Sequence, residues 1–252
     1  LPVIRVDREA FLRQQFADSE YLDEILEHGP QHVYTVESLR KKADGVIKKS
    51  TNQATLAAFV AGIPGGPAAV AAGGADVAQY FGFAINLAQK IAYLFGEDDL
   101  FTDESELNEG AKVRVLAYLG VMLGASGSAM LVGKLAREVG KNMGKKITQQ
   151  ALTKTTWYPL LKKIGAMVGK RVVKEPVGKA VAKVVPVVGG AISGVITYAT
   201  FKPMGGRLAD VLVRNLNGDF DETGMELRPE FKKTNALEDD AEVTIHAIEI
   251  DD

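Results

Sequence analysis

Apolar residues recur at three- and four-residue intervals along most of the chain, which is helical spacing. Residues 7–28 follow this spacing and end at Gly29-Pro30, which predicts an amphipathic helix. A second helix is expected at residues 36–50, with Leu39, Ala43, Val46 and Ile47 inward. Its outward residues are Arg40, Lys41, Lys42, Lys48 and Lys49. A solvated face is the first interpretation of these cations, and contact with a membrane is the second.

A long uncharged interval follows this helix. No charged residue occurs between Lys49 and Asp76, about the length of a helix that crosses a bilayer. Residues 64–67, Pro-Gly-Gly-Pro, interrupt the interval, because proline removes a backbone donor and clashes with the preceding turn. We therefore expect two short apolar helices around a break rather than one span. A regular helix is predicted from Ala75 to just before Gly96.

The middle of the chain has a second uncharged interval. Residues 97–109 read as an acidic loop, and a helix is predicted to start near Glu106. Between Arg114 and Lys134 no charge appears, and three glycines, at positions 120, 124 and 127, lie at a spacing that lets helices approach closely. This interval is short for a membrane span, so a buried core helix is the preferred interpretation.

Further helices are predicted towards the C-terminus. They cover residues 160–174 and an apolar unit at residues 177–201, kinked at Pro186. A short helix carrying Arg207, Asp210 and Arg214 is expected next, with these residues forming a surface ion-pair ladder. The prediction for residues 1–216 is thus an all-α, Gly/Ala-rich multi-helix bundle with kinked apolar helices.

Residues 217–252 are predicted to form an acidic C-terminal tail. One β-strand is possible within the tail, because apolar and polar residues alternate there. Its apolar positions include Val243, Ile245, Ile248 and Ile250. A lone strand must pair with this chain, with a second copy or with a protein partner.

The net charge of −2 conceals a strong segregation of charge. Residues 134–183 are rich in lysine and arginine and contain only two acids, Glu138 and Glu175, whereas the tail is acidic. This asymmetry predicts an anionic partner for the middle of the chain, or a middle and a tail that neutralise each other. The candidate anion-binding residues are Lys134, Lys141, Lys145, Lys146, Lys154, Lys162, Lys163, Lys170 and Arg171.

Residue patterns of catalytic, metal and nucleotide sites do not emerge from the sequence. The chain has no cysteine, which excludes thiol catalysis and Cys-ligated zinc. His28 and His32 have helical spacing, but Gly29-Pro30 separates them, so no metal pair is expected. Glycine–lysine segments in the basic region have three residues between glycines where a phosphate loop needs four, and few aromatics accompany the cations. We expect no cofactor and no nucleic-acid partner, and we favour a non-enzymatic protein over an enzyme.

Two polar residues of the central helix are assigned structural roles. Asp76 follows Gly73-Gly74, and we predict that it caps the N-terminus of a helix. Gln79 continues with Asn86 and Gln89 as a thin polar line, which is interpreted as a hydrogen-bonded seam between helices.

Two segments together resemble a known family. The first has the Pro-Gly turn, an apolar lead into Asp76, a Gln-containing apolar helix and an Ile91-Ala92-x-x-x-Gly96 ending. The second has the Val-Val-Gly-Gly-Ala-Ile-Ser-Gly run before Thr197 and Thr200, and a Gly205-Gly206-x-x-Ala209 ending. In these features residues 30–215 resemble the EcsC family of bacterial proteins. The resemblance implies an all-helical domain often found near membrane or transport systems, and it implies no catalytic residues.

Three functional hypotheses follow. The first is a non-enzymatic protein that associates peripherally with, or inserts into, anionic membranes through its basic face and Gly-rich apolar helices. The second is a soluble interaction or cargo protein that docks on a larger assembly through its acidic tail. The third is an enzyme or a lipid carrier that uses a cavity between apolar helices. Residues 1–16 lack the apolar core of a signal peptide, so we expect a cytoplasmic protein, peripheral to the inner face of the membrane.

Overall fold

The protein is all-helical in the part that the structure describes. The computed structural model describes residues 5–62, 67–100, 109–125, 127–137, 190–221 and 225–232. No strand of a sheet occurs among these residues, and the predicted all-α bundle is confirmed. The helices are α1 (Arg8–Gln15), α2 (Leu22–His28), α3 (Val36–Gly62), α4 (Pro67–Leu94), α5 (Glu109–Met122), α6 (Ser128–Arg137) and α10 (Gly190–Leu216), with 3-10 turns at Pro30–His32 and Pro229–Phe231.

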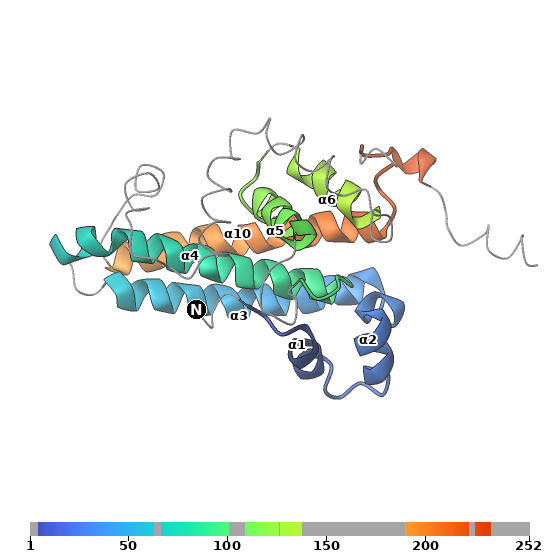
Figure 1. The fold of residues 1–252 in the computed structure, drawn as a ribbon, viewed down its shortest axis with the longest axis horizontal. Coiled ribbons are helices and arrows are strands. Elements are labelled where there is room, and N and C mark those ends of the chain that lie inside the picture. The colour runs from blue at the N-terminus through green and yellow to red at the C-terminus, as the bar shows by residue number, and fades with distance from the viewer. Residues whose placement is uncertain are drawn as a thin grey trace, which may run out of the picture.

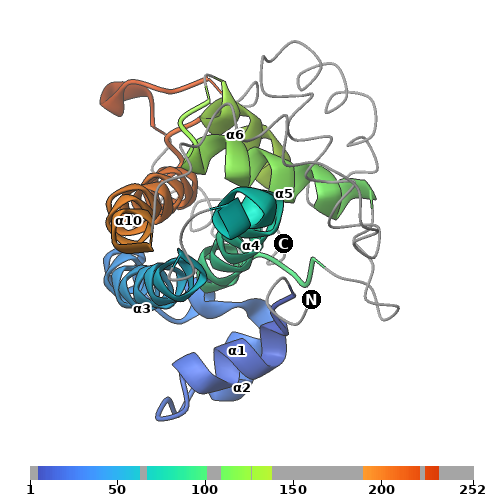
Figure 2. The same ribbon diagram turned by 90° about the vertical axis from the view of Figure 1, so that its left-hand side faces the viewer.

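Three long helices form the centre of the molecule (Figure 1). Helix α3 runs antiparallel to both α4 and α10. Its register with α10 is fixed by contacts along the two helices: Gly194 lies against Phe59, and Gly205 lies against Ile47. Viewed along these helices, α5 and α6 cover one side of the centre and α1 and α2 cover the opposite side (Figure 2).

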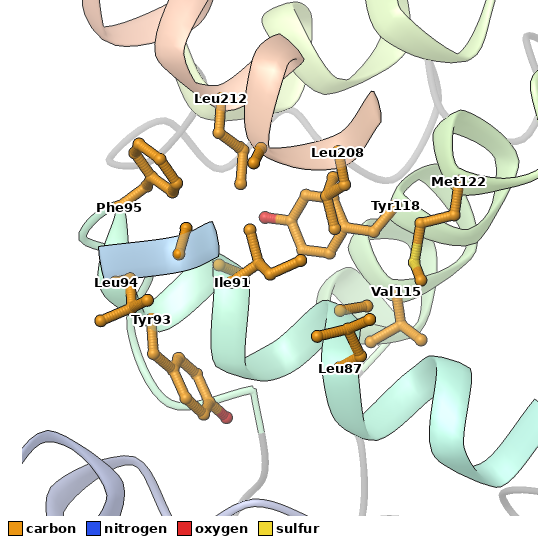
Figure 3. Packing of buried hydrophobic residues seen from close by; sticks show 14 of the residues in the cluster. Leu87, Ile91, Tyr93, Leu94, Phe95, Val115, Tyr118, Met122, Leu208 and Leu212 are labelled. Atoms are coloured by element: carbon orange, nitrogen blue, oxygen red, sulfur yellow. The ribbon is translucent and has the colours of Figure 1, made fainter. Parts of the chain in front are cut away.

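The main core lies where α4, α5 and α10 meet (Figure 3). Leu87 and Ile91 of α4 face Tyr118 of α5 and Leu208 of α10, and all four side chains are buried. Burying each aliphatic side chain contributes about 2 kcal/mol relative to exposure in water. This core is at the end of α4 that is far from the Pro-Gly break. Among the described residues, α1, α2, α5 and α6 pack around this end of the three long helices (Figure 1).

The predicted single helix at residues 7–28 is wrong, because the structure divides it into α1 and α2. Phe16 ends α1 and turns inward to stack on Tyr34, with ring centroids 5.3 Å apart. The Ser19 hydroxyl shares a 2.7 Å hydrogen bond with the Tyr34 hydroxyl. These contacts hold a turn that the apolar spacing alone could not reveal.

The predicted helix at residues 36–50 is part of a longer one. Helix α3 continues to Gly62 because its buried face continues, through Ser50, Thr51 and Ala54. Loss of charge after Lys49 therefore marks a change of surroundings along one helix and does not mark its end. The predicted inward set, Leu39, Ala43, Val46 and Ile47, is buried as expected.

The predicted break at residues 64–67 is confirmed, since α3 ends at Gly62 and α4 begins at Pro67. The two helices that flank it are not short, with 27 and 28 residues. Proline is well suited to the first position of a helix, where its missing N–H has no intrahelical acceptor in any case. Helix α4 runs through Gly73 and Gly74 without interruption, so the predicted start at Ala75 is wrong.

The predicted short helix after residue 201 is the second half of α10, which continues through Pro203. The predicted ladder of Arg207, Asp210 and Arg214 is wrong, because each of these side chains binds a different part of the protein. Asp210 accepts a 3.0 Å hydrogen bond from Nε of Arg40 on α3. Arg207 donates to the Met122 carbonyl of α5, and Arg214 pairs with Glu226. These residues tie α10 to its neighbours and do not bridge one another.

The glycines at positions 120, 124 and 127 do not form one helix-packing face. Gly124 and Gly127 have positive φ angles of 75° and 79° and form the turn between α5 and α6. Gly120 is the exception, because a Cβ there would stand 2.4 Å from the Ser128 hydroxyl oxygen of α6. Glycine at these positions thus permits a tight reversal rather than a long helix contact.

The chain folds back after α10 ends at Leu216. Phe220 is buried against Gly133 of α6, and its ring lies 5.1 Å from the Arg214 guanidinium. Asp219 pairs with Lys232 at 2.7 Å. The first residues of the predicted tail therefore pack on α6 and α10, while the proposed strand residues 243, 245, 248 and 250 and the predicted Pro186 kink lie outside the described residues.

Candidate functional site

The structure places few of the predicted site residues. Lys134 lies on α6 and is half-buried. The other predicted anion-binding residues, Lys141, Lys145, Lys146, Lys154, Lys162, Lys163, Lys170 and Arg171, lie outside the described residues. Their assignment stays a prediction.

The predicted capping role of Asp76 is wrong. Asp76 lies inside α4, nine residues after Pro67, so it does not cap a helix N-terminus. Gln79 is exposed, and its part in a hydrogen-bonded seam stays a prediction. Gln89 is the residue of that line which is buried: its side-chain oxygen accepts from the Val6 backbone N–H at 3.0 Å, and its nitrogen donates to the Ile85 carbonyl at 3.0 Å. The amide therefore fastens the N-terminal segment to α4.

The end of the bundle near the Pro-Gly break has an unusual charge distribution. We define the apolar end as residues 50–62 of α3, 67–80 of α4 and 190–201 of α10. These segments lie at the same level, because Gly194 contacts Phe59 and the Tyr80 hydroxyl lies 3.2 Å from that of Thr200. Asp76 is the only charged residue in the three segments. Charge is thus almost absent from three neighbouring helix ends (Figure 1).

Large apolar side chains are exposed on the apolar end. Leu56 and Phe59 of α3 are 64% and 44% exposed, and Val195 and Tyr198 of α10 are 69% and 44% exposed. The two pairs are adjacent, because a Cβ on Gly194 would lie 3.6 Å from the Cβ of Phe59. Adjacent exposed apolar residues mark a contact surface more often than scattered ones do.

Lysines lie next to these residues on the same helix faces. On α3, Lys48 and Lys49 precede Leu56 by seven or eight residues, which is two helical turns. On α10, Lys202 follows Val195 by seven residues and Tyr198 by four. Because the helices are antiparallel, both faces pass from lysine to apolar residues in the same direction along the bundle. The exposed surface is therefore amphipathic along its length.

A further lysine lies behind this pair of faces. Lys90 of α4 is partly buried, and its pKa is lowered from the usual value, first by burial and then by the positive charge of Lys49. Three exposed lysines, Lys48, Lys49 and Lys202, thus border the apolar end, and Lys90 lies near enough to Lys49 for the two charges to repel. Such a concentration of positive charge favours an anionic neighbour.

Threonine side chains are buried inside the apolar end. Thr51 of α3 is fully buried, Thr197 of α10 is 7% exposed, and Thr55 of α3 lies against Gly194 of α10. The hydroxyl oxygens of Thr51 and Thr55 have no hydrogen-bond partner in the described structure. Buried hydroxyls without a partner cost free energy, about 1–3 kcal/mol each. The contact between α3 and α10 is therefore weaker here than in the aliphatic core.

A second polar cluster lies at the opposite end of α4. Glu97 accepts hydrogen bonds from the Arg114 guanidinium and the Tyr118 hydroxyl of α5, and its backbone carbonyl accepts from Arg8 at 3.0 Å. Burial, reinforced by the charge of Glu97, raises the pKa of Tyr118 well above its usual value. The Tyr93 hydroxyl accepts from the Leu100 backbone N–H at 3.3 Å, and burial raises its pKa as well. These tyrosines stay protonated and join α1, α4 and α5, which is a structural function.

His28 and His32, for which no metal site was predicted, lie close together in the structure. The rings of His28 and His32 are 5.8 Å apart, although Pro30–His32 forms a 3-10 turn that ends the helical spacing. Within the described residues, no group of three or more His, Asp or Glu side chains is placed to hold a metal ion.

Sequence reasoning missed the four exposed apolar residues, Leu56, Phe59, Val195 and Tyr198. Their signal was present, because Leu56 and Phe59 fall off the inward stripe of α3 and are apolar on a face that carries lysines two or three turns earlier. Recognising it required knowing that α3 and α10 continue as single helices past residues 50 and 201.

Comparison of the chain with protein-family models, with curated proteins and with solved structures gave no match. The resemblance to the EcsC family therefore stays a prediction. Across the ranges that the structure describes, no helix is both long enough and apolar enough to cross a bilayer.

Proposed function

We propose that this protein associates peripherally with anionic membranes through the apolar end of α3, α4 and α10. The observation that carries the proposal is the pairing of exposed apolar side chains with lysines on the same two helix faces. Leu56 and Phe59 with Lys48 and Lys49, and Val195 and Tyr198 with Lys202, repeat one arrangement on adjacent antiparallel helices. Interfacial helices use this arrangement, with an apolar part in the acyl region and cations among the headgroups.

The magnitudes indicate reversible binding. Each of the four half-exposed apolar side chains contributes about 1 kcal/mol on entering the acyl region, from the area that it removes from water. Each lysine near an anionic surface contributes about 1 kcal/mol. The sum resembles the anchoring free energy of a single acyl chain, which is marginal and needs a second signal. We propose that the basic segment at residues 134–183 supplies that signal, as predicted from its charge.

The dimensions fit shallow insertion. Lys49 and Phe59 are ten residues apart on α3, and Lys202 and Val195 are seven apart on α10, about 15 Å and 10 Å along the helices. Flexible lysine stems reach towards the headgroups and extend that range. Tyr198 is placed between lysine and valine, at the level where membrane proteins concentrate aromatic residues. Asp76 opposes deeper entry, because a carboxylate in the acyl region is costly.

The proposed location follows from the lipid. Anionic phospholipids are concentrated on the cytoplasmic leaflet, so we place the protein on the inner face of the membrane. No enzymatic step is part of the proposal. A protein partner for the C-terminal strand residues stays a separate prediction.

Vesicle flotation tests the proposal. The full chain is expected to float with vesicles that contain phosphatidylserine and to stay behind with pure phosphatidylcholine vesicles. Raising the salt concentration is expected to weaken flotation, because surface charge interactions are screened within about 10 Å at 0.1 M salt. Absence of flotation with both vesicles would rule the proposal out.

A shortened chain distinguishes this function from docking through the tail. A protein that ends at residue 232 keeps the contacts of Phe220 and Lys232 and loses only residues outside the described structure. Under the proposal, it floats at least as well as the full chain, since the removed residues include seven acids and one lysine. Loss of flotation on truncation would instead assign membrane contact to the tail.

A further inference from the structure

The two halves of α10 are held to the bundle in different ways. After position 200 the helix contributes Phe201, Met204, Leu208 and Leu212 to the core, all buried. Before that position the buried residues with described side chains are Gly194 and Thr197, and the exposed ones include Val195 and Tyr198. Local opening costs least where few apolar contacts are buried. The first half of α10 is therefore the less firmly attached half.

The junction between the halves is a weak point of the helix backbone. Pro203 lies inside α10, and a proline there removes the hydrogen bond to the carbonyl of residue 199 and disfavours a straight helix. One turn earlier, the Thr200 hydroxyl donates to the Ile196 carbonyl at 2.8 Å. Such side-chain bonds to the preceding turn bend helices. Two independent features thus concentrate bending at residues 200–203.

Movement of the first half of α10 would open its contact with the end of α3, which contains buried threonines. On the α3 side it consists of Thr51 and Thr55, whose hydroxyls lack partners, and of Phe59, which lies against Gly194. Separation of the helices relieves the unsatisfied hydroxyls, because each becomes free to turn towards the carbonyl one helical turn before it or towards water. In water, opening also exposes apolar surface, and this cost keeps the closed form dominant.

We infer that the first half of α10, residues 190–199, pivots at residues 200–203 away from α3 when the apolar end enters the membrane. Lipid removes the cost that holds the closed form in water, since acyl chains solvate apolar helix faces as well as another helix does. The closed form therefore predominates in water and the open form on the membrane, because lipid binds the open form more tightly. This inference rests on the proposed membrane association and specifies how it is regulated.

A disulfide across the moving contact tests the inference. The chain has no cysteine, so an introduced pair is the only pair. A Cβ on residue 194 would lie 3.6 Å from the Cβ of Phe59, within the range of about 3.5–4.5 Å found in disulfides. In the double variant Phe59→Cys and Gly194→Cys, we expect the reduced protein to bind anionic vesicles more weakly than the unmodified chain, because the variant lacks the Phe59 side chain of the membrane contact. We expect the oxidised protein to partition at least tenfold less than the reduced one. Equal partitioning of the two forms would overturn the pivot and leave the proposed function standing.

Hydrogen exchange in solution tests the pivot without a membrane. Amides of residues 191–200 are expected to exchange at least tenfold faster than those of residues 205–214. In the double variant, oxidation of the two cysteines to the disulfide is expected to remove this difference. Pro203→Ala, which restores the missing donor, is expected to slow exchange in the first half as well. Uniform exchange along α10 in the unmodified chain would overturn the inference even if flotation succeeds. Failure of the reduced and unmodified proteins to float, with fast exchange retained, would instead remove the proposed function and the membrane trigger, and would leave only the hinge at residues 200–203.

Discussion

Gly205 of α10 lies directly against Ile47 of α3, so close that a Cβ on Gly205 would stand 2.9 Å from the isoleucine Cγ1. The same Cβ would stand 3.2 Å from a methyl group of Leu87 on α4. One glycine therefore sets the spacing of all three long helices. Its neighbour, Gly206, has no atom within 4 Å of the corresponding position.

Gly205→Ala is expected to destabilise the fold by about 1–3 kcal/mol, since overpacking a tight core forces neighbours to move. Gly206→Ala is the matched control. It is expected to stabilise the fold by about 0.5–1 kcal/mol, because alanine favours helix over the unfolded chain. Urea unfolding followed by circular dichroism measures both. Equal effects of the two substitutions would show that the approach of α3 and α10 is looser than described.

Tyr118→Phe is expected to lower the free energy of unfolding by about 1–3 kcal/mol. The substitution removes the hydroxyl that donates to Glu97 and leaves that largely buried carboxylate with a lost partner. Tyr21→Phe is the control, since Tyr21 is exposed and its loss of a hydroxyl is expected to change stability by less than about 0.5 kcal/mol. Chemical unfolding at neutral pH compares the two variants. An unchanged Tyr118→Phe variant would contradict the assigned hydrogen bond.

Stability is expected to fall as the pH rises above about 10, the ordinary pKa of tyrosine. Burial raises the pKa values of Tyr80, Tyr93 and Tyr118 in the folded protein. The folded state then holds protons that the unfolded state has lost, so alkali favours unfolding, by up to about 1.4 kcal/mol per pH unit per tyrosine. Lys90 acts in the opposite direction, because its lowered pKa makes it lose its proton first in the folded state. Unfolding from pH 8 to 11 measures the net trend, which Tyr118→Phe is expected to make less steep.

Leu56→Ser combined with Val195→Ser is expected to weaken partitioning into anionic vesicles about tenfold, a loss of about 1.4 kcal/mol from the removed apolar area. Both side chains are well exposed in the folded protein, so the melting temperature is expected to stay nearly constant. Met225→Ser provides the control, because Met225 is similarly exposed, at 59%, and lies outside the apolar end. Vesicle co-sedimentation at several lipid concentrations yields the partition coefficients. An equal loss with the control would show general rather than local contact.

Replacing Lys48, Lys49 and Lys202 by glutamine is expected to weaken binding to anionic vesicles and to flatten its dependence on salt. Each lysine near the surface contributes about 1 kcal/mol. Lys41→Gln is the control, because Lys41 is an exposed cation on the same helix, about two turns further from the apolar end. The slope of binding against salt concentration separates the two cases. A triple variant with the slope of the unmodified chain would place the anion contact elsewhere.

Apolar spacing predicted the helices well where one face is buried and the other is charged. The inward face of α3 at residues 39–47 is an example, since its positions are all buried. The same spacing failed after Lys49 and before Lys202, where helices continue with apolar residues on several faces. Amphipathicity requires a polar face, and without one the ends of helices cannot be located.

The candidate site was less accessible to sequence reasoning than the fold. Predicted anion-binding residues were chosen from charge density along the chain, whereas the lysines that border the apolar end, Lys48, Lys49 and Lys202, come from two helices and are brought together by packing. Local chemistry also misled: Asp76 follows two glycines, as a capping residue often does, yet the helix passes through all three. Glycine costs a helix only about 1 kcal/mol, which tertiary contacts readily offset.

Arg40 and Asp210 bond to each other across 170 residues of sequence, and α3 depends on α10 along much of its length. During synthesis the apolar helices α3 and α4 leave the ribosome well before their partner exists. At about 5–20 residues per second, this delay lasts on the order of ten seconds. The hairpin of α3 and α4 therefore exposes an apolar face during this interval, and a chaperone or the membrane surface is expected to bind it.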